Sequence, residues 1–133
     1  MAGYSAKPLW QKLGMKEEAT HVIINMPKDY PALLKAGEYK IALCANVFPN
    51  AHFIQLFTSS RMELEQIFPE LISALASRGM IWISWPKKSA KVVTDLDENI
   101  IREIGLALGI VDVKVCAIDE VWSGLKFLRR KNK

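Results

Sequence analysis

Two stretches decide the fold: Gly79-Met-Ile-Trp-Ile-Ser-Trp-Pro-Lys-Lys88 and Val111-Asp-Val-Lys-Val-Cys-Ala-Ile-Asp-Glu-Val-Trp-Ser-Gly-Leu-Lys-Phe127. Each contains β-branched and aromatic residues that favour strands and then continues into a polar, charged elbow. The second stretch holds two strand-like runs, joined by Asp119-Glu-Val or by a turn centred on Ser123 and Gly124, and so short a join predicts an antiparallel hairpin. In open α/β sheets, ligands usually bind at the rim that such strand ends form.

The chain before these stretches alternates between short helices and strands. Apolar runs predict strands at His21–Asn25, Tyr39–Ala45, Phe53–Phe57 and Met80–Trp85, with short helices at Leu9–Leu13 and from Pro27 to Leu34. This alternation, followed by the hairpin, predicts a mostly parallel, Rossmann-like, three-layer α/β sheet with a C-terminal antiparallel hairpin. The whole chain, residues 1–133, is expected to form one such domain.

Two longer helices are marked by their capping residues. Ser60 with Glu63 forms a capping-box pattern ahead of the first, and Gly79 is expected to close it in a left-handed cap. Pro69 either kinks this helix or starts a second one. The pair Thr94 and Asp97 predicts the start of the other helix, which a glycine at 109 should end.

Composition bounds the functional class. The chain has 133 residues, is 50% hydrophobic and carries a formal net charge of +4, which is typical of one soluble domain. It has no apolar run of membrane-spanning length and its first residues lack the apolar centre of a secretory signal, so we expect a cytoplasmic protein without a membrane partner. Cys44 and Cys116 each lie in an apolar run, which indicates buried hydrophobes rather than a disulfide or metal pair.

The order of elements resembles a shortened S-adenosylmethionine (SAM)-dependent methyltransferase domain. The resemblance lies in Lys12-Leu-Gly-Met-Lys-Glu-Glu-Ala-Thr-His-Val-Ile-Ile-Asn25, a helix, Ser77-Arg-Gly-Met-Ile-Trp-Ile-Ser-Trp-Pro86, a further helix and the final hairpin. In that superfamily a glycine-rich turn follows the first strand, and an acid after the second strand holds the ribose of the cofactor.

Both of those cofactor features are missing from this chain. The first strand continues into Asn25-Met-Pro-Lys-Asp-Tyr30, which has no glycine, and the second ends at Cys44-Ala-Asn-Val, which has no carboxylate. The sequence between the first and third strands is also short by about one βαβ unit of ~30 residues. We therefore expect the skeleton of the fold without its cofactor site, and we assign no cofactor.

A second resemblance covers nearly the whole chain. It rests on the N-terminal Ala2-Gly-Tyr-Ser, Trp85-Pro-Lys-Lys, Thr94-Asp-Leu, Val111-Asp-Val-Lys-Val-Cys-Ala and Trp122-Ser-Gly-Leu-Lys-Phe. In combination these motifs resemble a family of small bacterial proteins known only as a domain of unknown function. The resemblance implies a bacterial cytoplasmic protein but provides no activity or site residue to transfer.

The elbow after the fourth strand and the final turn hold the best candidates for ligand binding. Lys87 and Lys88 follow Trp85 directly, so two ammonium groups and an indole could meet a flat anion. Asp119 and Trp122 flank the final turn at the same edge of the sheet, and Arg61 after the third strand could add an anion contact. The candidate ligand-binding residues, none of them catalytic, are Arg61, Trp85, Lys87, Lys88, Asp119 and Trp122.

Each candidate also has a purely structural interpretation. Trp85 could pack on the sheet edge beside two solvated lysines, and Asp119 could accept a hydrogen bond from the Trp122 indole. Arg61 could be a solvated residue in the first turn of its helix. Three further residues, Thr94, Asp95 and Asp97, offer either a salt-bridged lid or acid/base pair near the lysines, or plain helix capping.

Several sites are not supported by the sequence. No nucleophile elbow, phosphate-binding loop or zinc spacing occurs, so no metal is assigned. His21 opens the first strand and His52 the third, which predicts that both lie at the amino edge, away from the rim.

The last eight residues concentrate positive charge, with Lys126, Arg129, Arg130, Lys131 and Lys133 and no acid. We expect a partly frayed basic end over about 126–133, which attracts polyanions weakly, so a nucleic-acid partner is not favoured. The hairpin leaves its final strand at a sheet edge, where it could pair with a second copy or be protected by Arg129 and Arg130, so monomer and homodimer both stay open.

Three functions follow from these features. The leading hypothesis is a non-catalytic or regulatory domain that binds an anionic small molecule or a protein partner at the rim. The alternatives are an enzyme of methyltransferase-like ancestry with an unconventional cofactor site, and a weak nucleic-acid binder through the basic end.

Overall fold

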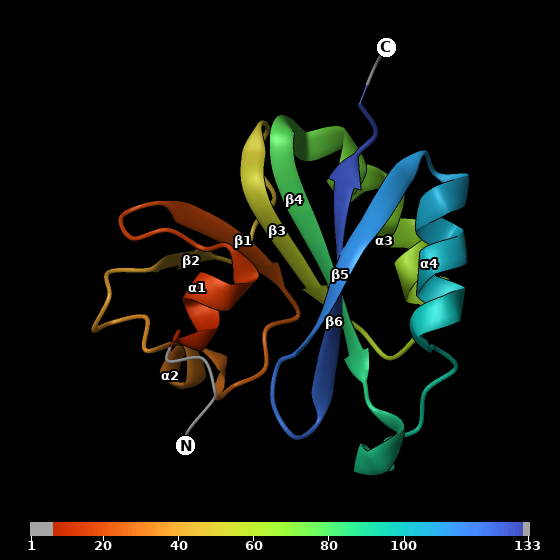
Figure 1. Cartoon of the computed structure of the whole chain (residues 1–133), viewed down its shortest axis with the longest axis horizontal. Helices are drawn as coiled ribbons and strands as arrows, with labels where there is room; N and C mark the ends of the chain where they lie inside the picture. The colour runs from red at the N-terminus through yellow and green to blue at the C-terminus, as the bar shows by residue number, and fades with distance from the viewer. Residues whose placement is uncertain (1–6, 132–133) are drawn as a thin grey trace.

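The computed structural model describes residues 7–131 and contains one six-stranded sheet with helices on both faces (Figure 1). The strands are β1 (Thr20–Ile24), β2 (Ala42–Cys44), β3 (Ala51–Phe57), β4 (Leu75–Pro86), β5 (Ile110–Ala117) and β6 (Trp122–Arg129). The helices are α1 (Leu9–Leu13), α2 (Tyr30–Leu34), α3 (Arg61–Ala74) and α4 (Glu98–Ala107), with the short 3-10 helix η1 (Lys88–Ala90). Two parts of the sequence analysis, the motif at residues 2–5 and Lys133, lie outside the described residues.

The sheet has the strand order β2-β1-β3-β4-β6-β5, and its first four strands are parallel. β6 runs antiparallel to both β4 and β5, so β5 points in the same direction as β4. This confirms the predicted Rossmann-like α/β sheet with a C-terminal antiparallel hairpin. The expectation that the final strand forms an edge is wrong, because the hairpin inserts β6 into the sheet and leaves β5 at the edge.

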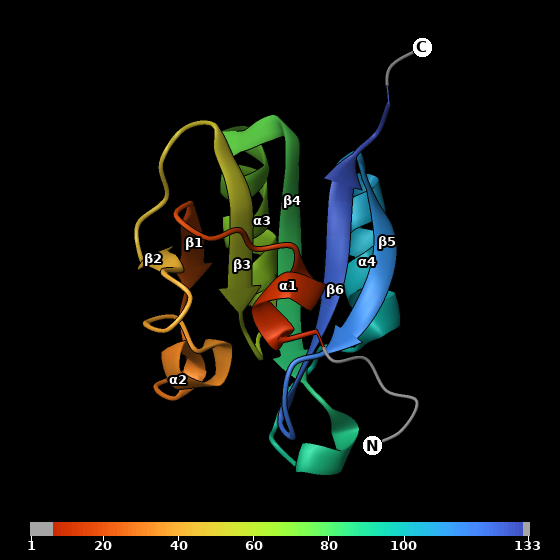
Figure 2. The same ribbon diagram turned by 60° about the vertical axis from the view of Figure 1, so that its left-hand side comes forward.

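Helices cover the two faces of the sheet unequally. The short helices α1 and α2 belong to one apolar cluster, in which the indole N–H of Trp82 in β4 donates to the carbonyl of Leu13 in α1 at 2.8 Å. The longer helices α3 and α4 belong to the other cluster, where Phe68 and Phe127 meet edge to face. Figure 2 shows α1 on the near face and α3 and α4 behind the sheet. None of the helices in residues 7–131 is long and apolar enough to cross a membrane.

α3 begins as predicted but ends earlier. The Ser60 hydroxyl accepts a hydrogen bond from the backbone N–H of Glu63 at 3.2 Å, and Pro69 lies inside a single continuous helix. The predicted left-handed cap at Gly79 is wrong, because the helix stops at Ala74 and Gly79 lies within β4. Glycine is needed there for space, since a Cβ would lie 2.9 Å from the carbonyl oxygen of Ala51.

The connection from β2 to β3 contains no helix. Only residues 45–50 join the two strands, although they lie on opposite sides of β1. The predicted second strand is also shorter than expected and covers only Ala42–Cys44. Both observations agree with the predicted loss of about one βαβ unit, and they leave β1 with little helical cover on the α3 face.

The basic end is partly built into the sheet. Lys126 and Arg129, which the sequence analysis placed in a frayed segment, both belong to β6. The guanidinium of Arg129 donates to the carbonyls of Ile72 and Leu75 at 2.7 Å each, which ties β6 to the end of α3. The chain then leaves the sheet at its amino edge, at the top of Figure 1.

Candidate functional site

Three of the predicted binding residues, Trp85, Lys87 and Lys88, line a shallow depression at the carboxyl edge of the sheet. Its volume is about 400 Å³, and its other lining residues are Asp97, Glu98, Asn99 and Ser123. The elbow is fixed to the final turn because the backbone N–H of Lys87 donates to the carbonyl of Val121 at 2.7 Å. The amino end of α4 opens onto the same depression.

The charges in this depression are unevenly paired. Asp97 caps α4 by accepting from the backbone N–H of Ile100 at 2.9 Å, and Glu98 forms an ion pair with Arg102. Neither Lys87 nor Lys88 has a side-chain partner among residues 7–131. The acids are therefore engaged within α4, and the two ammonium groups are left for a ligand or for water.

The two tryptophans do not meet. Trp85 is only 7% exposed and packs in the cluster beneath α3 and α4, so its ring offers no open face for stacking. Trp122 pairs with Pro86 in register, which places its side chain on the opposite face, where it meets Phe57 edge to face at 5.1 Å. The predicted stacking of the Trp85 indole on a ligand beside the lysines is therefore not available, because this ring is part of the core. Trp122, which was expected at the same rim, packs on the other face of the sheet.

Asp119 shapes the final turn. Its carboxylate accepts hydrogen bonds from the backbone N–H groups of Val121 and Trp122, both at 2.8 Å. The join between β5 and β6, residues 118–121, therefore contains Asp119-Glu-Val, the first of the two predicted alternatives. The partner of Asp119 is the Trp122 backbone rather than its indole.

Arg61 lies apart from the lysines. Its guanidinium pairs with Glu65 at 3.1 Å, and it lines a separate hollow between α3 and α4 with Glu65, Glu103 and Leu108. Its backbone N–H is bound by the carboxylate of Asp95 at 2.8 Å. The six candidates are thus divided: Trp85, Lys87 and Lys88 border the depression, Asp119 shapes the final turn, Trp122 packs against Phe57 on the opposite face, and Arg61 lines the hollow beside α3.

The segment before α4 holds the start of α3 rather than forming a lid. Thr94 donates from its hydroxyl to the carbonyl of Ser59 at 2.7 Å, next to the contact that Asp95 makes. Only Asp97 of the three predicted residues caps α4. Sequence reasoning could not detect the other two contacts because they join residues 34 and 35 positions apart.

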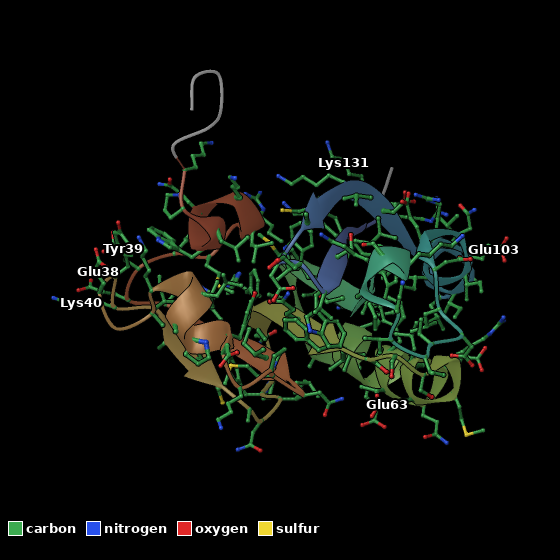
Figure 3. The ribbon with its side chains drawn as sticks, turned by 90° about the horizontal axis from the view of Figure 1, so that it is seen from below. Glu38, Tyr39, Lys40, Glu63, Glu103 and Lys131 are labelled. Carbon is green, nitrogen blue, oxygen red and sulfur yellow. The ribbon has the colours of Figure 1, made fainter. Side chains whose placement is uncertain are left out.

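A hydrogen-bonded group lies just beyond the carboxyl ends of β1 and β3. The side-chain amide of Asn25, just after β1, donates to the carbonyl of Phe57 at 3.1 Å and to the carboxylate of Glu63 at 3.3 Å. The same carboxylate accepts from the hydroxyl of Thr58 at 2.5 Å. Figure 3 looks at the molecule from below, toward this carboxyl edge, with Glu63 labelled on α3. The position of Glu63 in the capping box is visible in the sequence, but its use by β1 is not.

Beneath this edge runs a fully buried polar chain that the sequence analysis missed. Tyr30 donates from its hydroxyl to Gln55 at 2.5 Å, and the amide nitrogen of Gln55 donates to the hydroxyl of Ser84 at 3.0 Å. Burial raises the pKa of Tyr30 well above its usual range, so the phenol stays protonated. This hydrogen-bonded series joins α2, β3 and β4, and the side chains of Tyr30, Gln55 and Ser84 are bonded to one another within the protein.

The histidines lie where they were predicted, at the amino ends of β1 and β3. His21 is buried, with Nδ1 bonded to the carbonyl of Ala42 at 3.0 Å and Nε2 accepting from the backbone N–H of Lys16 at 3.1 Å. Burial outweighs the Ala42 contact and lowers the pKa of His21, which favours the neutral ring. Both cysteines are free, and within residues 7–131 no three metal-binding side chains cluster.

The fold matches several solved structures, among them SAM-dependent methyltransferases. A SAM complex of LepI is 16% identical with a TM-score of 0.56, covering 93% of this chain and 47% of LepI. A SAM-dependent methyltransferase from Aquifex aeolicus is 13% identical with a TM-score of 0.53, covering 90% of this chain and 86% of that one. A TehB-like SAM-dependent methyltransferase from Corynebacterium glutamicum is 8% identical with a TM-score of 0.57, covering 97% and 91%.

These likenesses establish the architecture and nothing finer. The chain spans about half the length of LepI, and all three identities are low. No protein-family model matches the chain, and no curated protein matches it either. The predicted methyltransferase-like fold is therefore confirmed, while the resemblance to a small bacterial family stays a prediction.

The residues at the carboxyl edge do not fit SAM in the way this fold implies. Where close backbone approach would require glycine, Asn25 adopts a left-handed conformation with φ 59° and fills the gap with its side chain. The helix after β1 has only five residues, and no carboxylate follows β2. The amide nitrogen of Asn25 and the hydroxyl of Thr58 both donate within the protein, so neither is the open approach that a glycine turn would give a cofactor.

Proposed function

We propose that this protein is a non-catalytic binding domain of methyltransferase-like architecture that takes a small anion at Lys87 and Lys88. The observation that carries the proposal is that both lysines line a depression and have no side-chain partner within the described residues, while Asp97 and Glu98 make contacts within α4. Two ammonium groups that form no ion pair of their own in the described chain attract phosphate or carboxylate, and the charges of Asp97 and Glu98 at the same depression reduce this attraction.

Two further groups support an anion at this place. The hydroxyl of Ser123 and the amide of Asn99 line the same depression and can donate hydrogen bonds to an oxyanion. The amino end of α4, a helix of ten residues, adds backbone N–H groups and a favourable dipole. The depression is shallow, so we expect weak, salt-dependent binding rather than a sealed site.

The test is a calorimetric titration of the purified protein with inorganic phosphate at fixed salt. Lys87→Gln with Lys88→Gln should lower the affinity at least tenfold. Lys28→Gln with Lys40→Gln removes the same charge from two exposed loop positions and should leave the affinity within about twofold. Equal losses in both double variants would attribute the binding to overall charge and overturn the proposal.

The alternative from the fold is an enzyme with an unconventional cofactor site. The same calorimeter with SAM and S-adenosylhomocysteine separates the two, because our proposal expects no saturable heat from either compound. Saturable SAM binding that survives the Lys87 and Lys88 changes would replace the non-catalytic proposal by the enzyme.

A protein partner could use the same two lysines through an acidic segment. A peptide of alternating Glu and Ser, titrated beside phosphate, distinguishes the two forms of the proposal. Tighter binding of the peptide, lost in the Lys87 and Lys88 variant, would favour the partner. Retention on single-stranded RNA at 0.15 M salt would instead favour the basic end as a nucleic-acid contact.

A further inference from the structure

A second and more enclosed cavity lies at the opposite, amino edge of the sheet. It has a volume of about 400 Å³, within the range of small-molecule sites. Its walls come from the loop after α1, the starts of β1 and β3, the loop between β2 and β3, and the irregular part of β4. The residues that matter for its chemistry are Lys16, Phe48, His52, Phe53, Arg78 and Met80.

The cavity exists because of two departures from regular structure. β4 pairs with β3 at Leu75 and again at Met80, so residues 76–79 bulge out of the sheet and carry Arg78 to the edge. The helix-free connection between β2 and β3 then brings Phe48 to the same cavity. Figure 1 shows β3 and β4 starting side by side at the top of the molecule.

The body of the cavity is apolar and partly aromatic. Phe53 is buried in the wall, Phe48 is half-buried, and Met80 packs where a Cβ on Gly14 would come within 2.9 Å of its thioether. The adjacent His21 uses both ring nitrogens within the protein, so it adds a flat surface rather than a free acid or base. Such a lining favours a flat or apolar ligand body over a fully hydrated ion.

The charge on the cavity is entirely positive. Lys16 and Arg78 are exposed, line the cavity, and have no side-chain partner among the described residues. Glu17 and Glu18 lie in the same loop as Lys16, yet neither lines the cavity, and no other carboxylate does. A guanidinium and an ammonium at the mouth of an apolar cavity are suited to a carboxylate head group, which Arg can bind through two parallel hydrogen bonds.

We infer that the amino-edge cavity binds a small aromatic carboxylate, with the ring against Phe48 and Phe53 and the carboxylate at Arg78 and Lys16. This site is distinct from the proposed anion site at Lys87 and Lys88. The seven residues of β3 separate the two edges by roughly 20 Å at about 3.3 Å per residue. Methyltransferase-like sheets bind ligands at the carboxyl edge, so this position is not implied by the fold.

The experiment is an amide-resolved NMR titration of the full chain with benzoate, alongside benzyl alcohol as the neutral analogue. We expect saturable shifts at residues lining the amino-edge cavity with benzoate, and at least fivefold weaker binding of benzyl alcohol. Arg78→Gln should weaken benzoate at least tenfold, and Lys16→Gln should weaken it about threefold. Arg61→Gln, an arginine at the carboxyl edge, should change nothing.

Several results would overturn the inference. Equal affinity for benzyl alcohol would show an apolar hollow that does not select anions, and shifts confined to residues 85–99 would place benzoate at the other edge. Because Arg78 is exposed, its variant should keep the wild-type amide spectrum, and Lys16→Gln provides an independent loss of charge. None of these results bears on phosphate binding at Lys87 and Lys88. The two proposals can therefore be overturned independently of each other.

Discussion

The two edges of the sheet differ in what their polar groups do. At the carboxyl edge, Asn25, Thr58 and Glu63 form hydrogen bonds with one another beyond the ends of β1 and β3, and the buried hydrogen-bonded series from Tyr30 to Ser84 lies beneath them. At the amino edge, the cations that line the cavity have no such partners in the described chain. The part of the carboxyl edge beside β1 and β3 is therefore better satisfied than the amino-edge cavity, while Lys87 and Lys88, farther along the carboxyl edge, have no side-chain partner among residues 7–131.

The difference shows that very few residues decide whether a given fold carries a ligand site at a given edge. After β1, where this architecture typically has a glycine-rich turn, Asn25 adopts a left-handed backbone and donates an internal hydrogen bond to Phe57. One missing helix between β2 and β3 exposes the amino edge and gives it an aromatic wall. Four predictions break or sharpen this comparison.

The largest effect is expected at Gly79, which holds the bulge of the amino edge. A methyl group there would lie 2.7 Å from Leu75 Cδ1 and 2.9 Å from the Ala51 carbonyl oxygen, so the strands must move apart. Gly79→Ala should lower the free energy of unfolding by about 2–3 kcal/mol, measured by urea denaturation. Gly37→Ala is the control, because nothing lies within 4 Å of its added Cβ, and it should be neutral or slightly stabilising.

Equal urea midpoints for Gly79→Ala and the wild type would mean that the bulge yields without cost. The amino-edge cavity would then be a soft feature rather than a preformed site, and the contrast between the two edges would weaken.

The second effect concerns the closure of the carboxyl edge by Asn25. Asn25→Ala should cost about 2 kcal/mol, since a left-handed alanine is disfavoured by roughly 1 kcal/mol and the lost hydrogen bond to Phe57 adds about 1 kcal/mol. Asn25→Gly keeps the backbone conformation available and should cost less. In urea denaturation, the difference in stability between the two variants measures the cost of the left-handed backbone. The stability lost in Asn25→Gly measures the contribution of the Asn25 side-chain hydrogen bonds.

If the Asn25→Gly protein were as stable as the wild type, the Asn25 side-chain hydrogen bonds would contribute nothing to stability. That result would contradict the proposed closing of the carboxyl edge by Asn25. Calorimetry of this variant with SAM sharpens the result. We expect no saturable heat, since the short α2 and the missing carboxylate after β2 are unchanged.

The sequence predicted features that depend on near neighbours. The cap of Ser60, the cap of Asp97 and the alternation of strands and helices all follow from spacings of a few residues, and the structure contains them. The lack of a glycine after β1 was visible in the same way. What fills the gap was not, because Glu63 lies 38 residues from Asn25.

Features that depend on register were not predictable. Trp85 and Trp122 lie near one another in the sheet, yet the pairing of Trp85 with Ser123 sends the two indoles to opposite faces. Gly79 has the local pattern of a helix end, but the strand pairing across Ala51 overrides it. Side-chain direction alternates along a strand, so an error of one residue in register would reverse each such assignment.

The third prediction is a pH dependence at the amino edge. The folded state lowers the pKa of His21 below the 6.5 of an ordinary histidine, so the unfolded chain binds the proton first. The contribution of His21 to stability is therefore complete above pH 6.5 and is lost as the pH falls from 6.5 toward the lower folded pKa. We expect the free energy of unfolding, measured in urea at a series of pH values, to decrease over this window.

The matched variants are His21→Leu and His52→Gln, which alter the only two histidines of the chain. His21→Leu should be less stable at neutral pH because the contacts to Lys16 and Ala42 are lost, and it should lack the decrease that His21 causes. His52→Gln should keep that decrease. A pH profile that is the same in His21→Leu as in the wild type would assign the dependence to other groups.

The smallest effect should come from the basic end that leaves β6 at the amino edge. Arg130 and Lys131 lie beyond the last strand and do not line the cavity, so they can act on a bound carboxylate only through the electrostatic field. At 0.15 M salt the screening length is about 8 Å, which predicts less than a twofold loss of benzoate affinity in Arg130→Gln with Lys131→Gln. Lowering the salt to about 0.01 M lengthens screening to roughly 30 Å, so the gap between variant and wild type should widen. A tenfold loss that persists at high salt would mean that the end contacts the ligand directly, and the amino-edge site would then extend beyond the cavity onto β6.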